Sequence, residues 1–477
     1  MMREGGYVST GQGVQFTHHG LTHHSSPQST AFLFRSQYFR MTETVPAPPR
    51  DLPAAVDFQE ASDGIECYRL VDNDLRILLL PQDGAPVATS MVTYHVGSRN
   101  ERTGHTGATH MLEHLMFKGT ERYHKRKGTS IFETLQSVGA KVNASTWLDR
   151  TNYYEMLPTE HLPLALDIEA DRMRGALIDA EDVEDERTVI LNERDRNQND
   201  PVSRLFDEVW GAAFVAHPYH HPTIGWKSDI ERITPDGLRE YYDTFYWPNN
   251  ATLSIVGRFD RGETLAEVAE HFGDIGPAPR DIPQVTTEEP EQSGPRRVTV
   301  RQDGQLGAVL MGFKSPPALE ADSDVLDVLA RILASGKGSR LFQRCTDQGL
   351  TSDVFGINFR LRDPGLFSVF AYLAPDQDHQ TVEDAIHETI ADVQENGVTQ
   401  EELDRARSQL RAQIAFDRDG PMRVASQLNE SLAAGDWKLY TQYLDRLDDV
   451  TAEDVQRVAQ TYLTRDGVTI GRYVPTS

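Results

Sequence analysis

The stretch GATHMLEHLMFKGT, residues 107–120, contains the arrangement His-x-x-Glu-His at His110, Glu113 and His114. Residues three and four apart share one face of an α-helix, so a helix here would project the three side chains together. Zinc hydrolases use such a set: imidazoles hold the ion, one coordination position stays open for water, and a carboxylate takes the proton of that water. The spacing therefore predicts a metal site.

The alternative is chance, because a chain with 16 histidines can carry this arrangement on an exposed helix. The surrounding sequence favours the metal site. Small residues precede the motif, and Lys118 and Gly119 follow it as expected of a helix C-terminus. The apolar residues expected to pack around it are Met111, Leu112, Leu115, Met116 and Phe117.

Two histidines leave a protein zinc site one ligand short, and the acid-rich segment 179–197 offers candidates. This segment is rich in helix formers and opens with acids, which suit a helix N-terminus. Glu186 and Glu193 are seven residues apart, or two helical turns, so they lie on one stripe of that helix. The apolar residues expected to face the core are Val183, Val189 and Ile190. Composition alone does not choose among the acids, since each could be an ordinary exposed glutamate.

Four segments, in the same order, resemble the pitrilysin and mitochondrial-processing-peptidase family of zinc metallopeptidases. They are GSRNERTGHTGATHMLEHLMFKGTERY (97–123), VNASTWLDRTNYYEMLP (142–158), ERTVILNERD (186–195) and a segment from HPYHHPTIGWK to IVGRFD (217–260). The resemblance extends from about residue 64 to the C-terminus. It is specific because several spaced motifs agree.

The resemblance assigns roles to the charged residues. It implies one zinc ion per chain with Glu113 as the general base, and Glu186 as a supporting carboxylate that orients a ligand. The zinc ligands that it implies are His110, His114 and Glu193. One local difference is Thr109, where the family usually has alanine. We expect this change to leave the metal site intact.

The segment 142–146 has the β-branched residues of a short extended strand. In the family, the equivalent segment is an edge strand that pairs with the backbone of the peptide substrate. The resemblance therefore implies that Asn143 and Ala144 bind substrate, and main-chain pairing explains how one enzyme accepts many sequences. Asn143 could hold a substrate carbonyl; the alternative is an asparagine that merely ends the strand.

A chain of 477 residues is too long for a single core. We expect residues 1–61 to be a disordered or wrongly assigned N-terminal extension, and residues 62–276 to form the metal-bearing domain. The proline- and acid-rich residues 277–296 are predicted to be a linker to a homologous domain, residues 297–477, which lacks the histidine motif.

Two similar segments predict that these domains arose by duplication. ITPDGLREYYDTFY (233–246) aligns without gaps on VTAEDVQRVAQTYL (450–463), and a strand is expected after each. Thr234 matches Thr451 as the residue that caps the helix N-terminus. The predicted fold class is α+β, with two homologous domains that each consist of a mostly antiparallel sheet packed with helices.

The second half departs from the family pattern. Family members usually carry an arginine and a tyrosine seven residues apart after the SRLF element, and both act on the substrate. Here the segment is GSRLFQRCTDQGLTSDV, in which Ser352 stands in place of the tyrosine and Thr346 or Arg344 lies near the arginine position. Arg340 of the SRLF element is expected to be structural. The resemblance thus implies a possible related subunit that supplies the missing pair; the alternative is a chain that works alone or as a homodimer.

The net charge of −26 excludes nucleic acid and anionic lipid surfaces as partners and favours basic peptides. No run of residues suggests a signal peptide or a membrane span, so we expect a cytoplasmic protein without a membrane partner. Cys67 and Cys345 are expected to be free thiols, because they fall in different domains.

Two functions remain open. The first is a zinc endopeptidase that cleaves extended peptides. The second is a catalytically silent structural subunit of a larger complex, since some relatives of this family have that role. Such relatives tend to lose the metal motif. Here the four residues that we call the motif set are all present, which favours the peptidase: His110, Glu113, His114 and Glu193.

Overall fold

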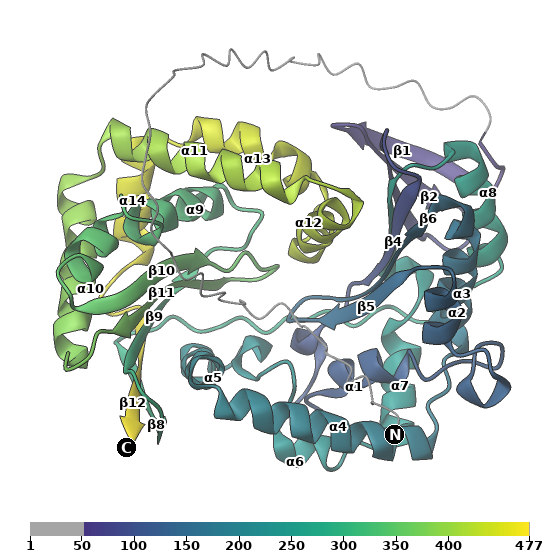
Figure 1. Cartoon of the computed structure of the whole chain (residues 1–477), viewed down its shortest axis with the longest axis horizontal. Helices are drawn as coiled ribbons and strands as arrows, with labels where there is room; N and C mark the ends of the chain where they lie inside the picture. The colour runs from purple at the N-terminus through teal and green to yellow at the C-terminus, as the bar shows by residue number, and fades with distance from the viewer. Residues whose placement is uncertain (1–51, 477) are drawn as a thin grey trace, which may run out of the picture.

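The computed structural model describes residues 52–476, and the first 51 residues lie outside it. Two β-sheets with helices around them form the two halves of the molecule (Figure 1). We call residues 56–276 the first half, residues 296–476 the second half, and the residues between them the linker. Strand β1 begins at Val56, six residues before the expected start of the metal-bearing domain at residue 62. Most of the expected N-terminal extension, residues 1–61, lies outside the described residues.

The strands and helices have the following bounds. The first sheet contains β1 (Val56–Ser62), β2 (Ile65–Leu70), β3 (Arg76–Pro81), β4 (Val87–Tyr94), β5 (Lys141–Thr146), β6 (Thr151–Pro158) and β7 (Ala251–Gly257). The second contains β8 (Arg296–Asp303), β9 (Ala308–Ser315), β10 (Thr351–Asn358), β11 (Gly365–Leu373) and β12 (Val468–Thr476). The first half has helices α1 (Ala108–Leu115), α2 (Ile131–Ser137), α3 (Leu162–Gly175), α4 (Ala180–Asn199), α5 (Pro201–Ala213), α6 (Lys227–Ile230), α7 (Pro235–Phe245) and α8 (Arg261–Phe272). The second half has α9 (Ala321–Ala334), α10 (His379–Asn396), α11 (Gln400–Asp417), α12 (Pro421–Ala434), α13 (Lys438–Asp449) and α14 (Ala452–Tyr462).

The two sheets share one topology. In the first sheet, the order is β1-β2-β3-β7-β4-β6-β5, and β7 pairs parallel with β3 and antiparallel with β4. In the second sheet, read from its other end, the order is β8-β12-β9-β11-β10, and β12 pairs parallel with β8 and antiparallel with β9. Five strands therefore correspond one to one, and the remaining pairs are antiparallel. This confirms the predicted fold of two related, mostly antiparallel α+β domains.

The segments that predicted the duplication occupy equivalent places. Thr234 caps α7 by accepting the N–H of Gly237, and Thr451 caps α14 by accepting the N–H of Asp454. Each helix then leads into the strand that has one parallel and one antiparallel neighbour in its sheet, β7 or β12. Asp179 and Thr399 likewise stand at the N-termini of α4 and α11, so these helices correspond as well.

In each half, one helix packs against the sheet of the other half. Helix α5 packs against β8, β9 and β12, where Val209 approaches so closely that a Cβ at Gly471 would lie 2.4 Å from its methyl group. Helix α12 packs against β4 and β7, and Leu428 and Leu432 are buried with strands β2 and β3. The halves are thus separate in sequence but interlocked in space, as Figure 1 shows for α12 beside β4.

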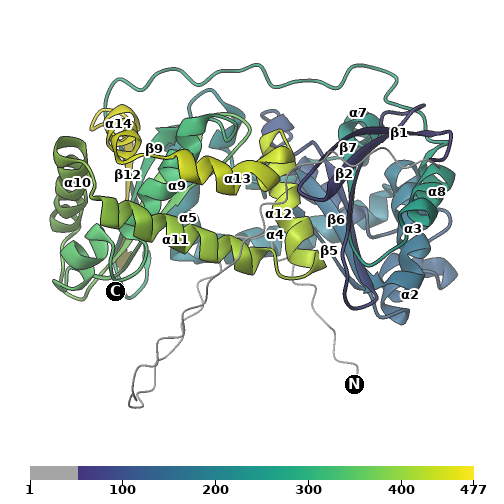
Figure 2. The same cartoon turned by 90° about the horizontal axis from the view of Figure 1, so that it is seen from above.

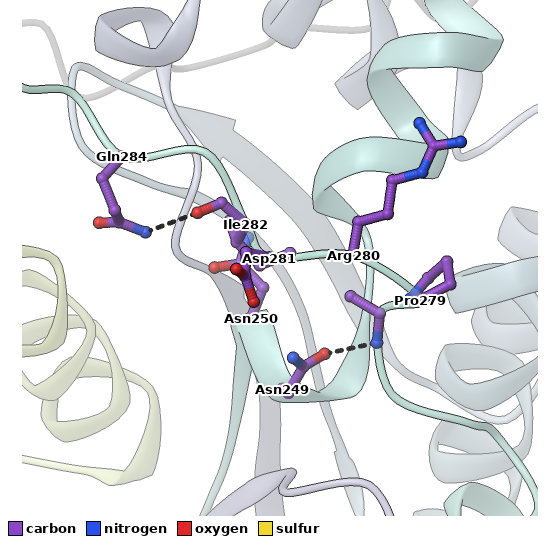
Figure 3. A pocket seen from close by; sticks show the side chains of 8 residues that line it. Asn249, Asn250, Pro279, Arg280, Asp281, Ile282 and Gln284 are labelled. Carbon is purple, nitrogen blue, oxygen red and sulfur yellow. Dashed lines mark hydrogen bonds between the residues drawn. The ribbon is translucent and has the colours of Figure 1, made fainter.

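The linker is extended and anchored at several points (Figure 2). Near its start, Asn249 accepts a hydrogen bond from the N–H of Ala278, and the two border a hollow of about 470 Å³ (Figure 3). Further along, the Glu289 carboxylate accepts the backbone N–H groups of residues 215–217, and Gln292 donates to the carbonyl of Val468. None of the residues expected at the metal site lines this hollow.

Within residues 52–476, none of the helices combines the length and apolar character that a membrane crossing requires. Cys67 and Cys345 are both buried and unpaired, in agreement with the prediction of free thiols.

Candidate metal centre

Helix α1 carries the histidine motif, and a glycine and a carboxylate fix its start. Gly107 has φ +87°, and a Cβ there would lie 2.6 Å from the carbonyl oxygen of Ile224, so only glycine fits. The buried Glu101 carboxylate accepts the N–H groups of Gly107 and Thr109, both at 2.8 Å, which stabilises the helix N-terminus. The Thr109 hydroxyl lies 2.8 Å from that of Tyr241. The threonine thus packs on the side of Tyr241.

Helix α1 ends at Leu115, earlier than the predicted Lys118–Gly119 terminus. The N–H of Phe117 donates to His114 and that of Lys118 to Leu115, which is the i to i+3 pattern of a tightened last turn. Gly119, with φ +132°, then turns the chain away.

The three residues that the family resemblance names as zinc ligands converge. Oε2 of Glu193 lies 3.8 Å from Nε2 of His110 and 3.8 Å from Nε2 of His114. One donor atom from each of the three residues lies within 4.8 Å of the others. A tetrahedral zinc ion with bonds of about 2.0–2.2 Å separates its ligands by roughly 3.4 Å. Glu193 therefore needs to approach each histidine by only about 0.4 Å, and no pair of donors needs to close by more than about 1.4 Å.

The donor set suits zinc chemically as well. Two imidazoles and one carboxylate leave a fourth position open, as in catalytic rather than structural zinc sites. Nε2 of His114 is buried and has no hydrogen-bond partner in the described part of the chain. This unsatisfied nitrogen faces Glu193, where a metal ion would satisfy it.

Glu186 and Lys118 fix the His114 ring on the side of Nδ1, opposite the nitrogen that faces Glu193. Nδ1 of His114 lies 2.7 Å from Oε2 of Glu186, and the other Glu186 oxygen forms an ion pair with Lys118. Burial alone would raise the pKa of Glu186, but the hydrogen bonds from His114 and Lys118 outweigh it and lower that pKa. An ionised Glu186 orients the ring so that Nε2 faces the donor cluster.

The two histidines have opposite tendencies. Burial, together with the neighbouring His114, lowers the pKa of His110 to about 3, so His110 is a neutral imidazole. Burial acts in the same direction on His114, but the carboxylates of Glu186, Glu113 and Glu193 raise its pKa overall. The negative charge around His114 therefore favours a cation at this point.

Glu113 is buried beside the donor cluster but is not one of its members. Its Oε2 has no hydrogen-bond partner among the described residues. Burial raises the pKa of Glu113, and Glu193 raises it further, while His114, Thr146 and Arg150 oppose the rise. A carboxylate next to a proposed ligand, with one buried oxygen free to take a proton, has the properties of a general base.

Asn143 and Ala144 lie on β5, the terminal strand of the first sheet. The N–H of Trp147 donates to the carbonyl of Arg150, which makes them a hydrogen-bonded pair at the turn into β6. Such pairs alternate along an antiparallel ladder, so Asn143 and Ser145 bond to β6. The backbone N–H and C=O groups of Ala144 therefore point to the free side of β5, where a peptide could pair with them.

In the second half, neither arginine near the expected substrate-binding pair is free. Arg340 binds Glu402 and the carbonyl of Gly397, which agrees with the structural role expected for it. Arg344 forms an ion pair with Glu388 on the surface. Ser352 is exposed on the edge strand β10, at a bulge where the register with β11 shifts.

Three further residues around the site were not predicted from the sequence. Lys118, four residues after His114, could have been found from helical spacing, because it lies next to Glu186. Arg150 and Glu430 form an ion pair across 280 residues of sequence, for which no local signal exists.

Val189 was predicted to face the core but is 41% exposed, because it lies one residue, or about 100°, away from the buried Ile190.

A two-domain α+β fold with an inverted zinc motif defines the class of this chain, and comparison with known proteins agrees. A family model described as "Insulinase (Peptidase family M16)" matches residues 76–226, which include all four residues of the motif set. A model described as "Peptidase M16 inactive domain" matches residues 232–410, which contain none of them.

Individual relatives give the same result. The zinc protease PqqE of Helicobacter pylori is 30% identical over 395 residues, covering 82% of this chain and 88% of that protein. A probable mitochondrial-processing peptidase subunit beta of Arabidopsis thaliana is 26% identical, covering 84% of this chain and 77% of that protein. The crystal structure of a protease from Helicobacter pylori has a TM-score of 0.82 at 28% identity, covering 87% of this chain and 100% of that one. The chain belongs to peptidase family M16.

Proposed function

We propose that this chain is a zinc-dependent endopeptidase that cleaves extended peptides. The observation that carries the proposal is the convergence of His110, His114 and Glu193 around one point, with Glu113 buried beside them. A bound zinc ion would act as a Lewis acid that makes water more acidic and polarises the peptide carbonyl.

Residues of the chain transfer the proton, orient the ligand His114 and bind the peptide. Glu113 takes a proton from the attacking water and delivers it to the nitrogen of the leaving amine, and its unpartnered Oε2 is free to carry that proton. Glu186 and Lys118 keep the His114 ring in place. The free edge of β5 at Ala144 pairs with the peptide backbone, and Asn143, on the same strand, contacts the bound peptide.

We further propose that the preferred substrates are unstructured and basic. A peptide that adds a strand to β5 must be extended, so a folded segment would have to unfold first. The net charge of −26 attracts basic chains and raises their rate of encounter at low salt. Raising the ionic strength should therefore lower the cleavage rate more for basic peptides than for neutral ones.

The partner of the chain is proposed to be a related subunit that lacks the histidine motif. Arg340 and Arg344 are engaged in ion pairs within the second half, and Ser352 is too short to replace a tyrosine hydroxyl. Groups that hold the carbonyl as charge develops on it contribute several kcal/mol to such reactions, typically about 3–4 kcal/mol for one donor. A second chain could supply them, and one relative is named as a beta subunit.

Assaying the purified chain on unstructured basic peptides, with and without added zinc, tests the proposal. Cleavage that requires zinc supports the peptidase. Full turnover by a chain shown to be free of any partner would rule out the need for a second subunit. A chain that binds zinc but cleaves nothing, alone or with a related subunit, would favour the silent structural role.

A further inference from the structure

The turn that ends the edge strand β5 is held by a buried arginine. The side chain of Arg150 is 4% exposed. Its Nη1 donates to the carbonyl oxygen of Ser145 at 3.0 Å and to the Ser145 hydroxyl at 2.6 Å. The Ser145 hydroxyl in turn donates to Asn152 on β6 at 3.0 Å. Arg150 thus fixes both the backbone and the side chain of the residue that follows Ala144.

The other side of the Arg150 guanidinium binds the second half of the chain. Glu430 of α12 accepts hydrogen bonds from Nε at 3.1 Å and from Nη2 at 2.6 Å. The neighbouring Asn429 donates to the same Glu430 oxygen and accepts a bond from Thr93 of β4. Helix α12 is therefore fixed on the first sheet at the point where it binds Arg150.

A second contact from the same half reaches the preceding residue of the turn. Asp149 is buried and accepts the N–H of Arg362, which lies between β10 and β11. The next residue, Asp363, pairs with Arg99 at 2.9 Å. The two residues Asp149 and Arg150 are thus both held by the half that carries no metal motif.

This arrangement adjoins the candidate catalytic centre. Strand β5 packs against helix α1, and Glu113 is a buried residue of that helix. The backbone groups of Ala144 and Thr146 point to the free side of the strand. A shift of the turn would therefore move the peptide-binding edge relative to Glu113.

A purely structural need would not require an arginine here. A buried ion pair is often no more stabilising than apolar residues of similar size, because both charges lose their hydration. An arginine instead offers a rigid, planar set of donors, which can fix the direction of two partners at once. Lysine has one mobile charge and cannot hold Ser145 and Glu430 in the same way.

We propose that Arg150 is a positioning residue through which the second half holds the free edge of β5 in register beside Glu113. This inference rests on the proposed peptidase function. It gives the half without a metal motif a part in substrate binding that does not depend on the missing tyrosine. The Arg150–Glu430 pair then affects the binding of long peptides, whereas the metal centre carries out the chemical step.

Kinetics with two peptides test the proposal. The first peptide is long enough to pair along all of β5, and the second spans only the scissile bond. Arg150→Met and Glu430→Gln are expected to raise KM for the long peptide roughly tenfold or more, with a change of less than about twofold for the short one. Arg150→Lys should recover only part of the loss, and zinc content should not change.

Arg418→Met is the matched control. Arg418 also joins the two halves, because it binds Asp63 of the first half at 3.3 Å and the carbonyl of Tyr440 within its own half. Asp63 lies between β1 and β2, at the opposite edge of the first sheet from β5. This variant should leave the ratio of the two peptide rates unchanged.

Hydrogen exchange measured on residues 141–154 gives a reading that does not depend on activity. Arg150→Met should make this hairpin exchange at least about tenfold faster than in the wild type or in Arg418→Met, because its ladder opens more often. Equal losses for both peptides together with unchanged exchange would overturn the proposal. If the wild type cleaves no peptide at all, the peptidase function fails, and the exchange data alone decide whether Arg150 holds the strand.

Discussion

Removing the charge of Glu186 should weaken zinc binding without removing a ligand. Glu186 contributes an oxygen 2.7 Å from Nδ1 of His114, and its side chain is 10% exposed, so water cannot readily replace it. Partners that support a metal ligand in this way typically change metal affinity by about 10–100-fold. Glu186→Gln keeps a hydrogen-bond acceptor and should raise the zinc Kd about tenfold, or about 1.4 kcal/mol. Glu186→Leu removes the acceptor as well and should approach a hundredfold, or about 2.7 kcal/mol.

Competition with a chromophoric chelator of known affinity measures this effect directly. Glu184→Gln is the matched control, because Glu184 lies on the same helix, is 73% exposed and binds Arg187 rather than a histidine. It should leave the zinc Kd within about twofold of the wild type. A Glu186→Leu variant with wild-type zinc affinity would show that Glu186 has no influence on His114 as a metal ligand.

Three other perturbations test the fold. Gly128→Ala should lower the free energy of unfolding by ~1–2 kcal/mol, because Gly128 has a positive φ. Gly107→Ala should lower it by more, because Gly107 has a positive φ and its new Cβ would also meet a backbone oxygen. Urea denaturation measures both changes. Leu205→Ala on α5 should cost about 2–5 kcal/mol and loosen the second sheet, where Leu205 packs with Val300 and Phe370, and hydrogen exchange on β8 and β11 would show this. Burial lowers the pKa of Lys314 to about 7, although Glu289 partly opposes this shift. Between pH 7 and the usual pKa of 10.5, Lys314 therefore carries a proton in the unfolded chain that it has lost in the folded chain. Stability should therefore rise with pH across this window, and Lys314→Met, compared by thermal denaturation, should lack that part of the rise.

Local sequence patterns predicted which side chains converge at the candidate metal centre, because most of that geometry is local. His110, Glu113 and His114 share a helix turn, and the spacing of Glu186 and Glu193 predicted that both would face the same neighbour. The family resemblance was still needed to choose Glu193 among the acids. The end of α1 at Leu115 was placed incorrectly, since the last turn changed to i to i+3 bonding.

The parts of the structure that could not be predicted depend on contacts between distant segments. The duplication was visible because Thr234 and Thr451 cap equivalent helices. The exchange of α5 and α12 between the two sheets was not, because an amphipathic pattern shows that a helix packs but not which sheet it covers. The pairing of Arg150 with Glu430 has the same cause. The cytoplasmic location, the cleavage preference and the related subunit stay predictions.

The most direct test of the central claim is to measure zinc content and peptide cleavage together in the wild type and in Glu113→Gln. We expect one zinc ion per chain in both proteins. Cleavage by the variant should fall by about 10²–10⁴-fold, because a general base is lost. The peptidase function would be wrong if the wild type binds no zinc although His110, His114 and Glu193 converge, or if the variant cleaves at the wild-type rate.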